Sequence, residues 1–222
     1  MLPEQREKYI LEGAIAFFSD VGFSGQTREL SRRLGITQPL LYRYFPSKQV
    51  LIDRVFEQVF LGRWNPQWVR LIQDGKVPLR ERLIEFYRQY AAVTYQPEWI
   101  RLYMYAGLAD TGINKRYLEL IETEFLSALC IELRRYCGIK KSAAAVSHEE
   151  IEFAWSLHGG LFYYAVRHFV FGSSINVDFM SNVALTVDNF LAGVPSTYPS
   201  LLSRPSTRTA TARRKAKPAG KA

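Results

Sequence analysis

The stretch from Thr27 to Lys48 most strongly constrains how this chain can fold. Its spacing predicts a short helix, a tight turn at Gly35 and a second short helix that starts near Gln38. Gly35 can take the left-handed conformation that ends a helix, and Thr37 is suited to cap the next one. Two helices across a tight turn, the second presenting polar and aromatic side chains, are typical of the helix-turn-helix motif that enters the DNA major groove.

The net charge of +8 is unevenly distributed along the chain. Seven of the 29 basic residues lie within 196–222, which contains no acidic residue, so the rest of the chain has 22 basic and 21 acidic residues. Within that nearly neutral part, the stretch from Thr27 to Lys48 has five basic residues and only Glu29 as an acidic one. A small basic patch on a neutral body favours one docked DNA-binding face over nonspecific coating of nucleic acid.

Apolar residues recur at helical spacing throughout the chain, and no segment alternates with period two over a useful length. The sequence therefore predicts an all-α fold of about nine helices, with a three-helix head before a larger body. We place a helix-turn-helix DNA-binding domain at 1–46, a ligand-binding and dimerisation domain at 47–195, and a disordered basic tail at 196–222. The tail either adds nonspecific DNA affinity or only solubility. The fourth helix is predicted to end at Trp64 and the last at Leu191.

The segment LGITQPLLYRYFPSKQVL combines several features in one fixed register. A glycine-hydrophobic turn, a Leu-Tyr pair, an aromatic pair and a Ser-Lys step follow one another, and Phe18 and Gly22 precede them at a fitting distance. From about Leu11 to Leu51 the chain therefore resembles the tetracycline-repressor (TetR) family of transcriptional regulators. It departs from that family at Gln26, where Thr or Ser is usual. The resemblance implies a homodimeric regulator, most often a repressor, that binds a palindromic operator and responds to a small ligand.

The candidate DNA contacts lie on and around the second helix of the motif. Gln38 can make the paired donor and acceptor contact to adenine, and Arg28 can do so with guanine, while apolar side-chain surface suits thymine methyl groups. Phosphate anchoring is expected from hydroxyl groups and from Lys48, at the N-terminus of the next helix. The full set, which matches the family's DNA-contacting positions, is Thr27, Arg28, Thr37, Gln38, Pro39, Leu40, Tyr42, Tyr44 and Lys48. The alternative is that this is only a solvated helix face.

The body is rich in aromatic residues, most of which must form its core. Many are Tyr or Trp, whose polar tips need partners when buried, and His158 adds a polar group in the same region. This combination predicts a mostly apolar pocket for an aromatic or otherwise hydrophobic effector, and the resemblance implies that it lies between the middle helices. The candidate ligand-binding residues are Phe60, Trp64, Phe86, Tyr90, Trp99, Tyr103, Trp155, His158 and Phe162. The alternative for each is an ordinary core residue.

The last two predicted helices have more apolar surface than packing within one subunit requires. Residues 149–171 are apolar on more than one face, and the pair Gly159-Gly160 in the middle suits the close approach of a neighbour. The resemblance implies that these two helices pair with those of a second subunit. The predicted interface residues are Leu157, Leu161, Ala165, Phe169, Val183, Val187 and Phe190.

Other functional classes are poorly supported. The sequence has no HExxH, phosphate-binding glycine loop or GxSxG elbow, so we expect no enzymatic activity, no metal site and no cofactor. No apolar run reaches the roughly 18 uncharged residues of a membrane span, and the N-terminal sequence lacks a signal-peptide core, so the expected location is the cytoplasm. The remaining alternative is a small-molecule-binding module whose helix-turn-helix head contacts protein rather than DNA.

Overall fold

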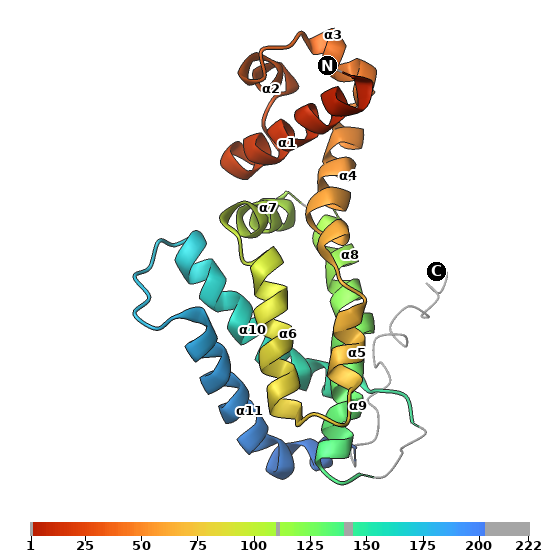
Figure 1. Ribbon diagram of the computed structural model, residues 1–222, viewed down its shortest axis with the longest axis vertical. Helices are drawn as coiled ribbons and strands as arrows, with labels where there is room; N and C mark the ends of the chain where they lie inside the picture. The colour runs from red at the N-terminus through yellow and green to blue at the C-terminus, as the bar shows by residue number, and fades with distance from the viewer. Residues whose placement is uncertain (1, 110–111, 140–143, 203–222) are drawn as a thin grey trace, which may run out of the picture.

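The structure, a computed structural model, describes residues 2–109, 112–139 and 144–202, and every regular element within them is helical. The predicted all-α fold is thereby confirmed. A small head at one end is joined to a longer helical body (Figure 1). The elements are α1 (Pro3–Val21), α2 (Thr27–Arg33), α3 (Gln38–Tyr44), α4 (Lys48–Val59), η1 (Leu61–Arg63), α5 (Gln67–Gln73), α6 (Leu79–Thr94), α7 (Pro97–Leu108), α8 (Ile113–Leu120), η2 (Ile121–Leu126), α9 (Ser127–Tyr136), α10 (His148–Phe169) and α11 (Phe179–Leu202).

The helices of the head begin and end where local sequence signals predict. α2 is followed by Gly35 at φ +63°, a left-handed conformation that glycine adopts without the steric cost of a Cβ. The Oγ1 atom of Thr37 accepts a hydrogen bond from the Leu40 amide at 3.4 Å and so caps α3. Ser47 caps α4 in the same way, with its Oγ 3.1 Å from the Val50 amide. The turn and both predicted caps are confirmed.

Helix α4 connects the head to the body (Figure 1). It packs against α1, and Leu51 and Val55 of its apolar face are fully buried. The same hydrophobic core continues from Phe18 in the head to Phe86 in the body. A movement of the body can therefore be transmitted to the head through α4.

A second connection joins α7 to the C-terminal end of α1. The Arg101 Nη2 and the Tyr105 hydroxyl both donate hydrogen bonds to the carbonyl oxygen of Asp20, each at 3.3 Å. The carboxylate of Asp20 in turn lies 2.9 Å from Arg33 Nη1 on α2. The body therefore contacts the helix-turn-helix motif by a route that does not pass through α4.

The lower body is held by a buried ion pair between α9 and α10. Arg134 donates from Nε and Nη2 to the two carboxylate oxygens of Glu150 at 2.7 and 2.6 Å, and the hydroxyl of Tyr198 donates to the same carboxylate at 2.8 Å. Burial alone would raise the pKa of Glu150, but the hydrogen bonds from Arg134, the Ser147 amide and Tyr198 outweigh it and hold that pKa below its ordinary value. Ser147 also caps α10 in the predicted capping box.

Two helix ends differ from the prediction. α4 ends at Val59 rather than Trp64, and a short 3₁₀ turn follows it. α11 continues past Leu191 to Leu202, through Pro195 and Pro199. Residues 196–202 are therefore helical, and placing the start of the disordered tail at 196 was wrong; residues 203–222 lie outside the described part of the chain. The buried hydroxyl of Tyr198 supplies the tertiary contact that supports this extension.

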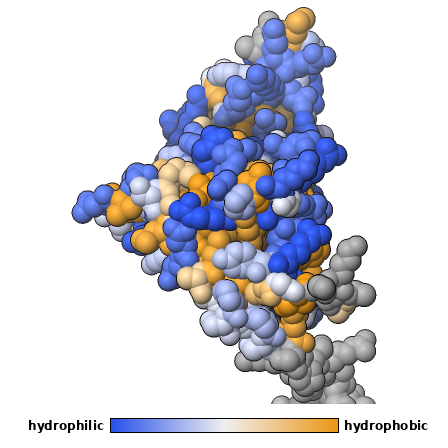
Figure 2. Space-filling view, turned by 60° about the horizontal axis from the view of Figure 1, so that its bottom comes forward, coloured by the Kyte–Doolittle hydropathy of each residue, from blue (hydrophilic) through white to orange (hydrophobic). Residues whose placement is uncertain are grey.

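The surface is divided between a hydrophilic head and a more apolar body. In Figure 2, hydrophilic residues dominate the upper end of the molecule and hydrophobic residues gather on the body below. Exposed large apolar residues of α10 and α11 include Tyr163 and Leu185, at 53% and 68% exposure. No helix in the described ranges is both long enough and apolar enough to cross a membrane.

Candidate nucleic-acid interface

A hydrogen-bonded group of three side chains links α2 to α3. The hydroxyl groups of Thr27 and Tyr42 lie 2.8 Å apart, and the Gln38 Nε2 donates to Thr27 Oγ1 at 3.2 Å. Thr27 is only 7% exposed, so its hydroxyl bonds to other residues of the head and is not available to solvent. The three residues were predicted as separate DNA contacts. The structure brings them together, because the hydroxyl of Thr27 is hydrogen-bonded to both Gln38 and Tyr42.

The basic residues of the motif fall into two groups. Arg32 forms an ion pair with Glu29 at 2.8 Å, and Arg33 pairs with both Glu29 and Asp20. The hydrogen bonds from Arg32 and Arg33 lower the pKa of Glu29 below its ordinary value, so it stays ionised. These two arginines are thus already matched by carboxylates.

Three other basic side chains of the motif have no carboxylate partner among the described residues. They are Arg28 on α2, Arg43 on α3 and Lys48 at the start of α4. Arg28 and Arg43 are exposed, Lys48 is half-buried, and the Arg43 guanidinium lies 5.5 Å from the ring centre of Tyr44. The positive charge available to an anionic partner is therefore concentrated on these three residues.

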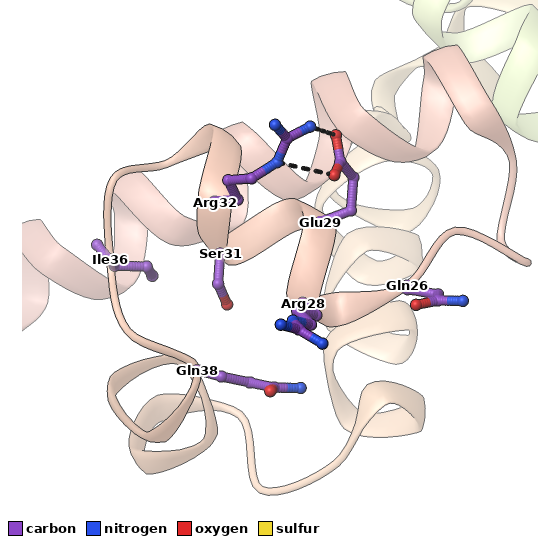
Figure 3. A pocket seen from close by; sticks show the side chains of 7 residues that line it. All are labelled: Gln26, Arg28, Glu29, Ser31, Arg32, Ile36 and Gln38. Atoms are coloured by element: carbon purple, nitrogen blue, oxygen red, sulfur yellow. Dashed lines mark hydrogen bonds and ion pairs between the residues drawn. The ribbon is translucent and has the colours of Figure 1, made fainter.

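A recess of about 470 Å³ lies between α2 and α3. Arg28 and Gln38 extend from the two helices toward the space between them, while Arg32 is turned away and held by Glu29 (Figure 3). The floor includes Ser31, whose buried hydroxyl has no hydrogen-bond partner in the described part of the chain. The two side chains suited to paired hydrogen bonds with bases thus share one recess.

The remaining predicted DNA contacts lie on the outer side of α3 and at its ends. Pro39 and Tyr42 are exposed, the latter at 37%, while Leu40 and Tyr44 are half-buried. Thr37 is exposed, although its hydroxyl already accepts the capping hydrogen bond. All of these positions stay candidates for DNA contact.

The predicted ligand-binding residues form a tightly packed aromatic cluster. Phe60 and Trp99 have ring centres 4.9 Å apart, and Trp99 stacks on Tyr103 at 5.2 Å and 11°. Tyr103 in turn meets Phe162 at 5.3 Å. Buried members of the set are Phe60, Phe86, Tyr90, Trp99 and His158, and half-buried ones are Trp64, Tyr103, Trp155 and Phe162. Because these rings fill the space between them, a ligand at this position would have to displace some of them; its binding there stays a prediction.

His158 is enclosed by this cluster. Its Nδ1 lies 3.4 Å from the hydroxyl of Tyr87, and the rings of Tyr90 and Trp155 meet it at 5.4 and 5.5 Å. Burial lowers the pKa of His158 to about 4, so the imidazole is neutral at physiological pH.

Most of the predicted dimer residues are buried inside one subunit. Leu157, Leu161, Ala165, Val183 and Val187 are at most 1% exposed in the single chain, because α10 and α11 pack against each other there. These five side chains are inaccessible to a partner, so naming them as interface residues was wrong. Phe169 and Phe190 are half-buried and stay candidates.

Residues that connect the head to the body escaped prediction. Arg101 and Tyr105 both bind Asp20, yet nothing in their spacing distinguishes them from other residues of an amphipathic helix. The sequence likewise did not predict that Tyr95, one of many aromatic residues, would be buried without a hydrogen-bond partner for its hydroxyl among the described residues. Contacts between residues more than 80 positions apart leave no periodic signal in a single sequence.

Comparison with known proteins matches the head by sequence. Residues 10–55 fit the family described as bacterial regulatory proteins, tetR family. The tetracycline repressor protein class C of Escherichia coli is 43% identical over 90 residues, which are 37% of this chain and 41% of that protein. The match therefore spans well under two thirds of that relative.

Solved structures match the chain over most of its length. A TetR family transcriptional regulator from Pseudomonas syringae pv. tomato str. DC3000 aligns with a TM-score of 0.58 and 20% identity, covering 86% of this chain and 97% of that one. A tetR-family transcriptional regulator from Streptomyces coelicolor aligns with a TM-score of 0.59 and 16% identity, covering 91% and 87%. At these identities the structures show a shared fold. The head thus matches the tetR family of bacterial regulatory proteins in sequence over residues 10–55, and the chain shares its fold with solved structures described as TetR-family regulators.

Proposed function

We propose that this protein is a DNA-binding transcription regulator, a repressor that binds a palindromic operator as a homodimer and is released by a small, mostly apolar effector. Residues 1–46 would bind DNA, and the body from 47 onward would bind the effector and the second subunit. The observation that carries the proposal is that Arg28 and Gln38 share one recess of a two-helix motif that fits the major groove, while Arg28 and Lys48 have no carboxylate partner among the described residues.

Gln38 is oriented for base readout. Its Nε2 already donates one hydrogen to Thr27, which leaves the second N–H and the Oε1 acceptor of the amide. One donor beside one acceptor is the pair that recognises N7 and N6 of adenine. Arg28 lies across the same recess and presents the fork that recognises guanine.

Phosphate contacts would position the motif without reading sequence. Lys48 lies in the first turn of α4, where its ammonium group and the unpaired amides of the helix N-terminus both favour an anion. Arg43 and Tyr44 are the last two residues of α3, and the guanidinium of Arg43 lies 5.5 Å from the ring centre of Tyr44. These groups provide salt-dependent affinity for any duplex.

A second copy of the chain would cover exposed parts of α10 and α11. Gly159 and Gly160 are exposed in mid-helix, and no side chain or distant backbone of the described residues lies within 4 Å of where a Cβ would be. Two mid-helix glycines cost about 1 kcal/mol each relative to alanine, and no neighbour in the described part of the chain fills the space they leave. Exposed Tyr163 and Leu185 extend the same helices' apolar surface.

DNA binding is tested by fluorescence anisotropy with duplexes from the DNA flanking the protein's own gene, at several stated salt concentrations. We expect binding with a steep salt dependence, and loss of discrimination against unrelated duplex in the Arg28→Ala/Gln38→Ala double variant. Lys8→Ala removes a charge from α1, away from the recess, and should bind as the unmodified protein does. Absence of binding to every duplex at low salt would support the alternative that the head contacts protein.

The oligomeric state is tested separately by light scattering at micromolar concentration. We expect a dimer for the unmodified chain and dissociation for Leu185→Glu, which places a charge in the proposed interface. Leu108→Glu changes an 83% exposed leucine on α7 and should leave the dimer intact. A stable monomer in the unmodified protein would exclude the homodimer.

A further inference from the structure

Helix α7 lies directly below α1 and contacts its C-terminal end (Figure 1). Arg101 and Tyr105 are one helical turn apart on α7, so their side chains lie on the same face. The Nη2 atom of Arg101 and the hydroxyl of Tyr105 each donate a hydrogen bond of 3.3 Å to the Asp20 carbonyl oxygen. Two side chains of the body thus converge on one backbone atom of the head.

The Asp20 carbonyl is suited to receive both donors. Asp20 is the last residue but one of α1, and the last four carbonyls of a helix have no partner within it. A carbonyl oxygen has two lone pairs, and the C-terminal end of a helix has a partial negative charge that favours a cation. Helix α1 has no basic residue in its last turn, so the Arg101 guanidinium of α7 provides that charge.

The ring of Tyr105 also fits the turn that follows α1. Gly22 is buried and has φ +77°, which glycine adopts without the steric cost of a Cβ. A Cβ at this position would lie 3.0 Å from the Cδ1 atom of Tyr105, closer than a normal contact. The backbone of the head therefore lies directly against this ring, at a distance that a larger residue would prevent.

Asp20 connects this contact to α2. Its carboxylate pairs with Arg33 Nη1 at 2.9 Å, and the Arg33 guanidinium lies 5.0 Å from the ring centre of Phe17. Arg33 is the last residue of α2. The position of α2, and of the recess that it forms with α3, is therefore linked to α7 through Asp20.

The contacts of α4 and α7 restrict the head in different ways. The contact through α4 is mainly apolar, and apolar burial is non-directional. Hydrogen bonds weaken steeply when their angle departs from linearity, so those from Arg101 and Tyr105 restrict rotation of the head relative to the body. In a dimer, the angle between head and body decides how far apart the two heads lie.

We propose that Arg101 and Tyr105 are positioning residues that fix the angle between head and body and so determine which spacing between two operator half-sites the protein accepts. The inference rests on the proposed function, because it requires a homodimer that binds two half-sites. One added base pair moves a half-site by about 3.4 Å and turns it by about 35° around the DNA axis. A firmly held head cannot follow that displacement, whereas a loosely held one can.

The test begins with the operator that the full chain selects from a randomised duplex pool. Duplexes with one or two base pairs added or removed at the centre of this operator are compared by fluorescence anisotropy. We expect the unmodified protein to prefer one spacing. Tyr105→Phe should reduce that preference about fivefold, as the loss of one hydrogen bond predicts, and combining it with Arg101→Met should reduce it further. Preference for bases within each half-site should stay unchanged, because both residues lie outside the head.

The matched control is Tyr9→Phe. Tyr9 donates to the Leu34 carbonyl at 3.1 Å, so this variant also removes a tyrosine hydroxyl bound to a carbonyl at a helix end, but within the head. It should keep the spacing preference of the unmodified protein. Thermal melts establish that each variant is folded. An unchanged spacing preference in the double variant, or an equal loss in Tyr9→Phe, would overturn the assignment.

A measurement without DNA separates this inference from the proposed function. Spin labels at Lys8→Cys on α1 and Lys76→Cys in the body, both exposed positions, report the distance from head to body by double electron–electron resonance. Cys137 is replaced by Ser, and an excess of unlabelled chains restricts the signal to distances within one chain. The double variant should broaden the distance distribution. An unchanged distribution would show that Arg101 and Tyr105 do not fix the head, whereas a broadened one without binding to any duplex would reject the proposed function.

Discussion

The Nε2 atom of Gln38 lies 3.2 Å from the Oγ1 atom of Thr27, so a residue of α2 fixes the side chain that we propose reads a base. The same threonine hydroxyl lies 2.8 Å from that of Tyr42. Restricting a side chain before it binds reduces the conformational entropy lost on complex formation. In the proposed DNA-binding role, Thr27 would therefore affect DNA affinity through its two neighbours, even though it is itself nearly buried.

Thr27→Val should weaken operator binding about fivefold, the effect of losing one hydrogen bond that positions Gln38 and Tyr42. Valine keeps the shape of threonine, so the fold of the head should be retained. Anisotropy titrations with the operator and with single-base variants measure both affinity and preference. Tyr9→Phe serves as the control in the head, because it removes from α1 a hydroxyl that donates to the Leu34 carbonyl at the end of α2. Equal affinities for Thr27→Val and the unmodified protein would show that the hydroxyl has no positioning role.

Glu150→Gln should destabilise the body by about 3 kcal/mol, because it leaves the buried Arg134 guanidinium without its counter-charge. Both side chains are at most 7% exposed. Chemical denaturation monitored by circular dichroism measures the change. Glu152→Gln, at an exposed position of the same helix, should have little effect. Similar stabilities for the two variants would mean that the pair is not important for folding.

The neutral state of His158 predicts a dependence of stability on pH. Its pKa is about 4 in the folded protein, because the imidazole is buried, and about 6.5 when unfolded. The unfolded state therefore binds the proton first, and the free energy of unfolding should fall by about 3 kcal/mol between pH 6.5 and pH 4. His158→Gln should lose this component, whereas His168→Gln, at an exposed position, should keep it. The same slope in both variants would contradict the assignment to His158.

Tyr95→Phe should stabilise the protein when no ligand is present. Removing an unpaired buried hydroxyl is worth about 1 kcal/mol, which corresponds to a rise in Tm of about 2 to 4 °C for a domain of this size. Tyr164→Phe provides the comparison, since it loses the 2.8 Å hydrogen bond to Val177 and should melt at a lower temperature. If the two variants shifted Tm in the same direction, the hydroxyl of Tyr95 would have a partner after all.

The head could be predicted from sequence because its signals are local. Gly35 supplies a left-handed turn, and Thr37 and Ser47 each cap the helix that follows. Each of these effects depends on residues at most three positions apart. The grouping of Thr27, Gln38 and Tyr42 could not be predicted, since it depends on how two helices are oriented across the turn.

The body was predictable only in outline. Apolar periodicity shows that one face of α10 is buried but does not show what covers it, and residues such as Leu161 and Val187 proved to pack within the chain. Pro195 and Pro199 favour a helix end, yet α11 continues through both because Tyr198 is bound to Glu150. That bond joins residues 48 positions apart.

We propose that this head reads DNA with Gln38 and holds it with Lys48. The most direct measurement is selection of preferred sequences from a randomised duplex pool by Gln38→Ala, Lys48→Ala and the unmodified protein, with affinities at two or more salt concentrations. Gln38→Ala should lose preference for adenine at one position of each half-site. Lys48→Ala should keep the unmodified preference, bind all sequences more weakly and reduce the salt slope by about one. Equal losses in both variants, with no change in sequence preference, would contradict this division of roles.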